Sequence, residues 1–149
     1  MGIGVLESNG SRPEVVTFES VDIPKKNSLP EKLKVIYDRV SDFVEKYQPD
    51  VMALENVFYG ENVQSLVKIG EARASAMLAA ANKKIPVMEY PPARVKQAVS
   101  GNGRATKIQI QQMVKILLHL KTPPPVDAAD ALAVALCHLQ SQNVRLPVG

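Results

Sequence analysis

Three acidic residues of this 149-residue chain occur where carboxylates often take part in chemistry: Glu55, Asp127 and Asp130. Glu55 follows the apolar run 51–54, which is typical of a strand covered on both faces. Open α/β sheets bind their ligands at the carboxyl ends of such strands. Asp127 and Asp130 are three residues apart, so a helix would place both carboxylates on one face.

Packing that helix beside the strand would bring the three carboxylates together. Crowded carboxylates repel one another, and some take up protons unless cations join them. Oxygen ligands without a paired His or Cys select magnesium or manganese rather than zinc. Two such ions about 4 Å apart can activate a water and stabilise the leaving oxygen of a phosphodiester. Such a site would suit phosphodiester hydrolysis with two Mg²⁺ ions, or with Mn²⁺ in their place.

Each acidic residue also has a purely structural interpretation. Glu55 could be the first solvated residue after a buried strand. Asp127 is a good N-cap, and Asp130 would lie near the positive end of the helix, where a carboxylate is stabilised by roughly 0.3–1 kcal/mol. The two residues between the aspartates, Ala128 and Ala129, nevertheless leave both carboxylates unobstructed, as a metal site requires.

The positive charge of the chain is unevenly distributed. The formal net charge is +3, yet no aspartate or glutamate occurs between Tyr90 and Val126. The basic residues of this acid-free segment are Arg94, Lys96, Arg104, Lys107, Lys115 and Lys121. Such asymmetry indicates a surface that binds an anion, and nucleic acid is the obvious large one. A solvated helical face without a partner is the alternative.

Composition excludes several classes of protein. The chain is 46% hydrophobic and 22% charged, and it contains no apolar run near the ~18–20 residues that span a bilayer. Its first residues lack the pattern of a signal peptide. The single cysteine, Cys137, excludes an internal disulfide and fits a cytoplasmic protein. His119 and His138 lack a matched metal ligand or nucleophile, so we expect them at the surface or in an interface. Gly101-Asn102-Gly103 does not match a P-loop.

The candidate residues depend on an alternation of strands and helices. Strands are predicted at 3–8 and 15–23, joined as an antiparallel hairpin, and at 51–55 and 85–90; helices are predicted from 30 to 47, from 61 to about 84, from 93 to 99, after 106 and from about 127. Thr106 is the expected cap of the fourth helix, and Pro123-Pro124-Pro125 its expected end. This order favours an α/β fold with a mixed sheet and helices on both faces. We expect one domain over 1–142 and an unstructured tail at 143–149.

The chain resembles the RuvC family of Holliday junction resolvases, which have a ribonuclease H-like fold. The resemblance covers nearly the whole chain, in the family's order. It runs through Ala53-Leu54-Glu55-Asn56-Val57-Phe58, Ile69-Gly70-Glu71-Ala72-Arg73, Val87-Met88-Glu89-Tyr90, Val95-Lys96-Gln97 and Asp127-Ala128-Ala129-Asp130-Ala131-Leu132-Ala133. It implies a homodimer that cuts two strands of a four-way DNA junction symmetrically with magnesium, in recombination and repair, alongside a branch-migration motor complex.

The resemblance also implies roles for the acidic residues and for one aromatic residue. Glu55, Asp127 and Asp130 correspond to metal ligands of the family. Phe58 corresponds to an aromatic side chain that lies against the bases near the junction centre. The alternative for Phe58 is a loop aromatic that packs on the core.

Basic residues of the acid-free segment correspond to DNA contacts in the family. Lys96 and Lys107 match residues that meet phosphates and the reacting strand, which adds Lys107 to the catalytic set. General attraction to the DNA backbone is expected for Arg94, Arg104 and Lys115. The small-residue helix that starts at Glu61 is the expected location of part of the dimer contact.

One part of the family pattern has no counterpart in this sequence. The family opens with a strand reading roughly Gly-Ile-Asp-Pro-Gly, whose aspartate is the fourth metal ligand, whereas Met1-Gly2-Ile3-Gly4-Val5 resembles the second strand. We therefore expect weaker metal binding and exposed strand edges. Our hypothesis is a shortened gene or a misassigned start, and a stop codon immediately before Met1 would contradict it. The alternative function is a junction-binding protein without nuclease activity.

Overall fold

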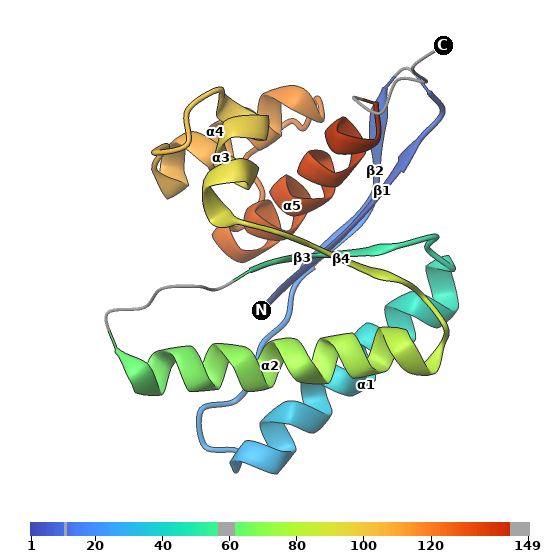
Figure 1. Ribbon diagram of the computed structural model, residues 1–149, viewed down its shortest axis with the longest axis vertical. Coiled ribbons are helices and arrows are strands. Elements are labelled where there is room, and N and C mark those ends of the chain that lie inside the picture. The colour runs from blue at the N-terminus through green and yellow to red at the C-terminus, as the bar shows by residue number, and fades with distance from the viewer. Residues whose placement is uncertain (11, 57–61, 144–149) are drawn as a thin grey trace.

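The computed structural model describes residues 1–10, 12–56 and 62–143, in which strands and helices follow the predicted order. The elements are β1 (Gly2–Ser8), β2 (Pro13–Ser20), α1 (Leu29–Tyr47), β3 (Met52–Glu55), α2 (Val63–Asn82), β4 (Val87–Tyr90), α3 (Pro92–Ser100), α4 (Lys107–Leu117) and α5 (Val126–Asn143). Figure 1 shows α1 and α2 on one side of β3 and β4, and α3, α4 and α5 on the other. Asn143, which we expected in the tail, belongs to α5, and the rest of the tail lies outside the described residues.

The strands form two separate pairs in the described part of the chain. β1 and β2 pair antiparallel, with Gly2 opposite Ser20, which confirms the predicted hairpin. β3 and β4 pair in parallel, with Glu55 opposite Tyr90. Both kinds of pairing are thus as predicted, but the expected mixed sheet consists of two small sheets. The reason is that no strand among the described residues lies between the pairs to join their ladders.

Two hydrophobic clusters hold the layers together. The first consists of Ile36, Val40, Val44, Ala76 and Ala79 from α1 and α2; the second is built mainly from α3, α4 and α5. Met52 of β3 packs against the first cluster and Ala53 against the second. Neighbouring residues of a strand point to opposite faces, so β3 is covered on both faces, as its apolar run predicts.

Helix α5 lies very close to β1. A Cβ atom added at Gly2 would come within 1.9 Å of the Asp127 carbonyl oxygen, and one added at Gly4 within 2.7 Å of Leu132 Cδ2. Glycine at these two positions therefore permits the approach. This packing brings the first turn of α5 next to the strands.

Local signals set most of the helix boundaries. Thr106 caps α4 as predicted, through a capping box with Gln109. α4 nevertheless ends at Leu117, well before the proline run, so our prediction of its end is wrong. His119 adopts a positive φ of 54°, which takes the chain out of the helix before the prolines are reached.

His138 is buried inside the chain, which contradicts our expectation of a surface or interface histidine. Its Nδ1 lies 2.6 Å from the hydroxyl oxygen of Tyr90, the last residue of β4. The physical reason is that α5 is apolar around most of its circumference, so that almost any position between Ala128 and His138 faces other elements. Cys137 beside it is buried too. Within the described ranges, no helix combines the length and hydropathy needed for a membrane span.

Candidate active site

Glu55 lies at the carboxyl end of β3, where it is half-buried. β4 ends at the same level, because Glu55 is opposite Tyr90 and the Asn56 amide donates to the Tyr90 carbonyl oxygen at 2.8 Å. α3 begins at Pro92, directly after β4. This edge of the small parallel sheet is therefore where side chains of the neighbouring helices meet Glu55.

A cavity of about 180 Å³ at this edge is lined by four charged side chains. Glu55 comes from β3, Lys96 from α3, Lys107 from α4 and Asp130 from α5. The rest of its wall consists of Pro92, Val95, Ile110 and Ala133. The structure thus brings together four of the residues singled out in the sequence, each from a different element.

The environment of the cavity disfavours the charge of both carboxylates. Burial raises the pKa of Glu55, and the Asp130 carboxylate raises it further. Burial likewise raises the pKa of Asp130, with a contribution from Asp127. Lys107 and Lys96 lower the pKa of both groups. A divalent cation would relieve the repulsion, and oxygen donors suit magnesium, so this donor set fits the metal that the sequence predicts.

Lys107 is the first residue of α4, at the end of the helix where the macrodipole disfavours a cation. Its side chain lines the cavity with Glu55 and Asp130, and it lowers the pKa of both carboxyl groups. Residues that go against a local preference in this way occur typically at functional sites. The position of Lys107 is therefore explained by the carboxylates and not by the helix.

Asp127 lies apart from the cavity lining. It is inside the first turn of α5 and not at the cap, because the helix begins at Val126. Its side chain is 55% exposed, with Oδ2 3.6 Å from the Met1 amino nitrogen. Among the described residues, no group of three or more His, Cys, Asp or Glu side chains lies close enough to hold a metal ion. The structure thus brings Glu55 and Asp130 to one cavity, and the role of Asp127 stays a prediction.

The other predicted DNA contacts lie away from the cavity lining. Arg94 donates to Ser141 Oγ at 3.0 Å, and its guanidinium lies 5.3 Å from the centre of the Tyr90 ring. Arg94 therefore fastens α3 to α5. Arg104 is exposed in the turn between α3 and α4. Phe58 lies outside the described residues.

Arg73 of α2 is a residue of this region that the sequence analysis missed. Its guanidinium contacts the main-chain oxygen of Glu55 and the side chains of Asn56 and Glu89. The available signal was the segment Ile69-Gly70-Glu71-Ala72-Arg73, which carries the family resemblance without an assigned role. Spacing along the chain did not connect α2 with the end of β3.

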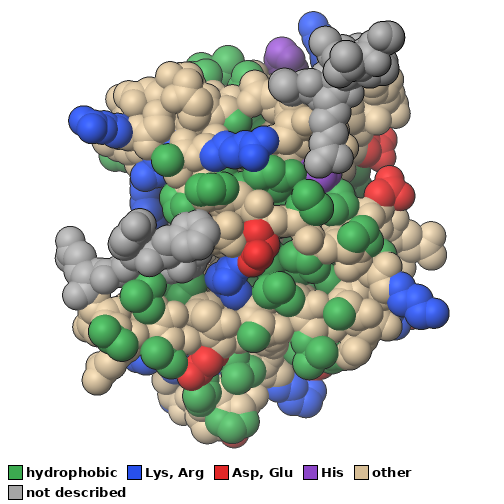
Figure 2. All heavy atoms as spheres, in the orientation of Figure 1, with side chains coloured by type: hydrophobic (Ala, Val, Ile, Leu, Met, Phe, Trp, Pro, Cys, Tyr) green, Lys and Arg blue, Asp and Glu red, His purple; other side chains and the backbone are tan. Residues whose placement is uncertain are grey.

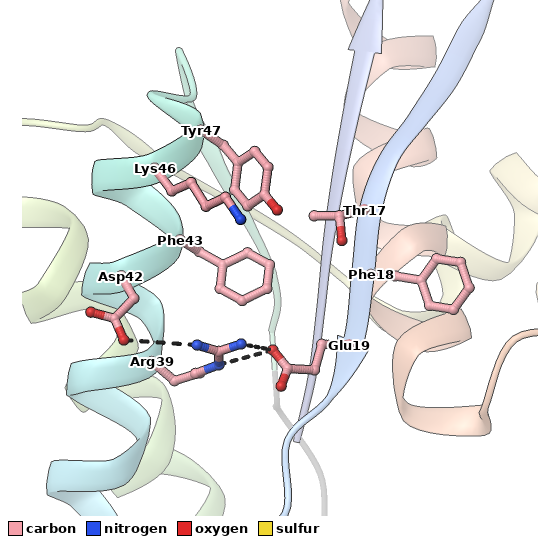
Figure 3. Close-up of a pocket in the computed structure, with 8 residues that line it drawn as sticks. All are labelled: Thr17, Phe18, Glu19, Arg39, Asp42, Phe43, Lys46 and Tyr47. Atoms are coloured by element: carbon pink, nitrogen blue, oxygen red, sulfur yellow. Dashed lines mark hydrogen bonds and ion pairs between the residues drawn. The ribbon is translucent and has the colours of Figure 1, made fainter.

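A larger cavity, of about 260 Å³, lies between β2 and α1 (Figure 3). Phe43 and Tyr47 point from α1 toward the strand, and Arg39 lies between Asp42 and Glu19. Arg39 donates to Glu19 Oε2 through Nε at 2.8 Å and Nη2 at 2.5 Å. These paired charges fasten α1 to β2, so we assign the chemistry to the smaller cavity, where two carboxylates repel each other.

Nearly the whole chain is similar to known crossover junction endonucleases. The family described as "Crossover junction endodeoxyribonuclease RuvC" matches residues 1–138. The protein of that name from Teredinibacter turnerae is 49% identical over 147 residues, covering 96% of this chain and 83% of its own length. The protein of the same name from Alkaliphilus oremlandii is 44% identical over 144 residues, covering 96% of this chain and 88% of its own length.

Solved RuvC structures are similar to this chain over 96% of its length. Thermus thermophilus RuvC in complex with a Holliday junction substrate has a TM-score of 0.89 at 32% identity, over 96% of this chain and 88% of that one. The similarity confirms the predicted ribonuclease H-like fold class. The family match includes every residue that lines the charged cavity. The chain therefore belongs to the RuvC family of crossover junction endodeoxyribonucleases.

Proposed function

We propose that this chain is a structure-selective endonuclease that resolves four-way (Holliday) DNA junctions by metal-dependent hydrolysis, in recombination and repair. The observation that carries the proposal is the cavity in which Glu55 and Asp130 face Lys96 and Lys107. The similarity to a relative solved with a Holliday junction supports the same activity. Nothing in the structure or in the comparisons favours a junction-binding protein without nuclease activity.

Glu55 and Asp130 would hold the metal in this proposal, and Asp127 would join them from the same face of α5. The ion is Mg²⁺, with two ions at the site and Mn²⁺ as a substitute. When bound, such cations neutralise the carboxylates and polarise the phosphate and the attacking water. The raised pKa values of Glu55 and Asp130 support this assignment, because burial and neighbouring carboxylates disfavour the ionised groups, and a bound cation would offset both effects.

Lys107 and Lys96 would contact the phosphate at the cut and stabilise the charge that develops on its oxygens. Both side chains line the cavity that contains the carboxylates. In the free protein they balance the charge of Glu55 and Asp130. When DNA binds, the same ammonium groups meet a phosphate, so Lys107 belongs to the catalytic set.

The acid-free segment between β4 and α5 would bind the DNA backbone around the cut. Arg94 and Arg104 are both exposed there, and general attraction of phosphates requires no closer geometry. Phe58 follows Glu55 by three residues in the sequence, and it would lie against the bases at the junction centre. In this proposal the charged segment and the aromatic residue both contact the DNA around the cut.

A homodimer would cut both strands symmetrically, and α2 supplies the surface for it. Val63, Val67 and Leu78 lie on one stripe of this helix at 75%, 52% and 55% exposure. Figure 2 shows hydrophobic side chains gathered along the band that α2 occupies in Figure 1. An apolar stripe of this kind is typical of a covered interface. We place the dimer in the cytoplasm of a bacterium, alongside a branch-migration motor complex.

The proposal is tested by incubating a synthetic four-way junction with the chain and Mg²⁺, next to a Glu55→Gln variant. We expect paired symmetric nicks from the original chain and none from the variant. A Lys107→Met variant should bind the junction and cut it at least about 100-fold more slowly, the usual size for a lost transition-state contact. Junctions that are bound but never cut by the original chain would contradict the nuclease proposal.

A further inference from the structure

Arg73 joins three parts of the chain next to Glu55. Its Nε donates to the Glu55 main-chain oxygen at 3.1 Å, and its Nη2 lies 3.5 Å from Asn56 Oδ1. The same Nη2 forms an ion pair with Glu89 of β4. The Arg73 side chain is 23% exposed, and its contacts with Glu55 and Asn56 are partly buried, whereas Glu89 is 40% exposed.

The peptide unit between Glu55 and Asn56 is held from both sides. Its carbonyl oxygen accepts from Arg73 of α2, and its amide donates to the Tyr90 carbonyl oxygen of β4 at 2.8 Å. Because the peptide unit is planar, fixing it restrains ψ of the residue before it, and with ψ the direction of that residue's Cα–Cβ bond. The two hydrogen bonds therefore restrain the backbone from which the Glu55 side chain enters the cavity lining.

A guanidinium is suited to this position because its donors form a rigid planar fork. One edge of Arg73 meets a carbonyl oxygen, while a second nitrogen meets the Glu89 carboxylate. A lysine could replace the charge but has a single nitrogen, so it could not hold both groups. The contacts thus depend on arginine and not only on positive charge.

We propose that Arg73 is a positioning residue that orients Glu55 for metal binding through the Glu55–Asn56 peptide. This inference rests on the proposed function, because it takes Glu55 to be a metal ligand. Groups that orient a metal ligand typically change metal affinity or activity 10–100-fold when they are replaced. Arg73 itself does not touch the metal or the DNA at the cut in this proposal.

The test compares Arg73→Ala and Arg73→Lys with Arg39→Ala. Arg39 is the matched control, since it also joins a helix to a strand by pairing with a glutamate, but at the distant cavity. For each protein we would measure Mn²⁺ binding by calorimetry, thermal stability, junction binding in EDTA, and the Mg²⁺ concentration that half-saturates cleavage. A purely structural role would change only thermal stability.

We expect both Arg73 variants to bind Mn²⁺ about tenfold or more weakly and to need correspondingly more Mg²⁺, with junction binding in EDTA unchanged. Arg39→Ala should lose thermal stability but keep the original Mn²⁺ affinity. If Arg73→Ala does not fold, the Mn²⁺ affinity of Arg73→Lys tests the inference, because lysine keeps a positive charge for the ion pair with Glu89. Unchanged metal affinity in a folded Arg73→Lys protein would overturn the inference.

Failure of the inference and failure of the proposed function give different results. If the original chain binds Mn²⁺ and cuts the junction, and the Arg73 variants behave like Arg39→Ala, only the positioning role of Arg73 is wrong. If the original chain neither binds Mn²⁺ nor cuts, the nuclease proposal is wrong, and the inference falls with it.

Discussion

At the scale of single residues, the decisive feature is one cavity lined by two carboxyl groups and two lysines. The carboxyl groups belong to Glu55 and Asp130, and the lysines are Lys96 and Lys107. Burial and mutual repulsion raise the pKa of Glu55, burial and Asp127 raise that of Asp130, and Lys96 and Lys107 lower both. Metal binding requires the carboxylates in their ionised form. The lysines therefore keep the site closer to the protonation state that a cation needs, before any DNA has bound.

Replacing Lys107 by Met should raise the pKa of Glu55 in the metal-free protein. The substitution removes a positive charge that favours the ionised carboxylate and keeps a side chain of similar length. The pKa is measured by following the side-chain carbon of Glu55 by NMR as the pH is changed. Lys115→Met, in the same helix but outside the cavity lining, is the control. A lower pKa in the Lys107 variant would contradict the electrostatic account.

Replacing Glu55 by Gln should stabilise the metal-free protein at pH 7. The pKa of Glu55 is higher in the folded chain than in the unfolded chain, so the folded state binds the proton more tightly, and stability falls as pH rises through the folded pKa. Gln has no carboxyl group to ionise, so the variant does not lose stability in this way. We expect its free energy of unfolding to be larger by roughly 0.5–1 kcal/mol, a small gain because water partly screens the half-buried carboxyl group.

The pH dependence of that gain gives the check. Urea unfolding should show the advantage of Glu55→Gln above the raised pKa, and the advantage should disappear as the pH falls below the ordinary value of 4.5. Glu45→Gln, on the exposed face of α1, should show no such gain. An advantage that grows toward low pH would mean that the sign of our argument is wrong.

At the scale of elements, the position of α5 against β1 decides where the aspartates lie. Asp130 reaches the cavity only because the helix carrying it lies close to the strands, and glycines at Gly2 and Gly4 permit that distance. The close packing of α5 on β1 is thus what brings the Asp130 carboxylate into the cavity. α3 and α4 complete the site by bringing Lys96 and Lys107 to the same edge.

Replacing Gly4 by Ala should destabilise the protein by about 1–3 kcal/mol, the usual cost of overpacking. The new Cβ would lie 2.7 Å from Leu132 Cδ2, so the fully buried Leu132 side chain must shift against its neighbours, or α5 must move with it. Gly70→Ala is the matched control, since a Cβ there meets nothing within 4 Å and alanine favours the helix. Thermal unfolding should show a lower Tm for the first variant and a higher Tm for the second. Equal Tm values would contradict the close packing of α5 on β1.

At the scale of the whole molecule, the two faces of α2 differ in their surroundings. One face packs on α1 through Ala76 and Ala79 in the first hydrophobic cluster. The other carries Val63, Val67 and Leu78, which are exposed in the single chain. A dimer formed through this second face would be symmetric, with the same residues on both partners, and would carry two cavities for two cuts.

Replacing Val67 by Glu should convert the proposed dimer to a monomer. A charge at the centre of an apolar contact would be buried without a partner, which costs several kcal/mol. Sedimentation of the purified proteins would report the mass, with Ile116→Glu as the control, because Ile116 is also exposed but lies on α4. The monomer should also lose the paired symmetric cuts. A dimeric Val67→Glu protein would contradict the assignment of the interface to α2.

The sequence by itself determined the elements and the identity of the charged residues. Apolar periodicity, the Thr106 cap and the apolar run before Glu55 each involve only a few neighbouring residues. They can therefore be recognised in the sequence without knowledge of the fold. The same patterns identified Glu55, Asp130, Lys96 and Lys107, and the family resemblance assigned their roles. The predicted end of α4 was wrong, because a backbone turn at His119 ends the helix several residues before the proline run.

Only the tertiary structure decided which of these residues meet. It joined two carboxylates with two lysines from four elements, left Asp127 outside that cavity, and buried His138 against Tyr90. It also connected Arg73 with the Glu55–Asn56 peptide. These contacts join residues that are far apart in the chain, and their distances depend on how helices pack on strands, which no pattern of neighbouring residues records.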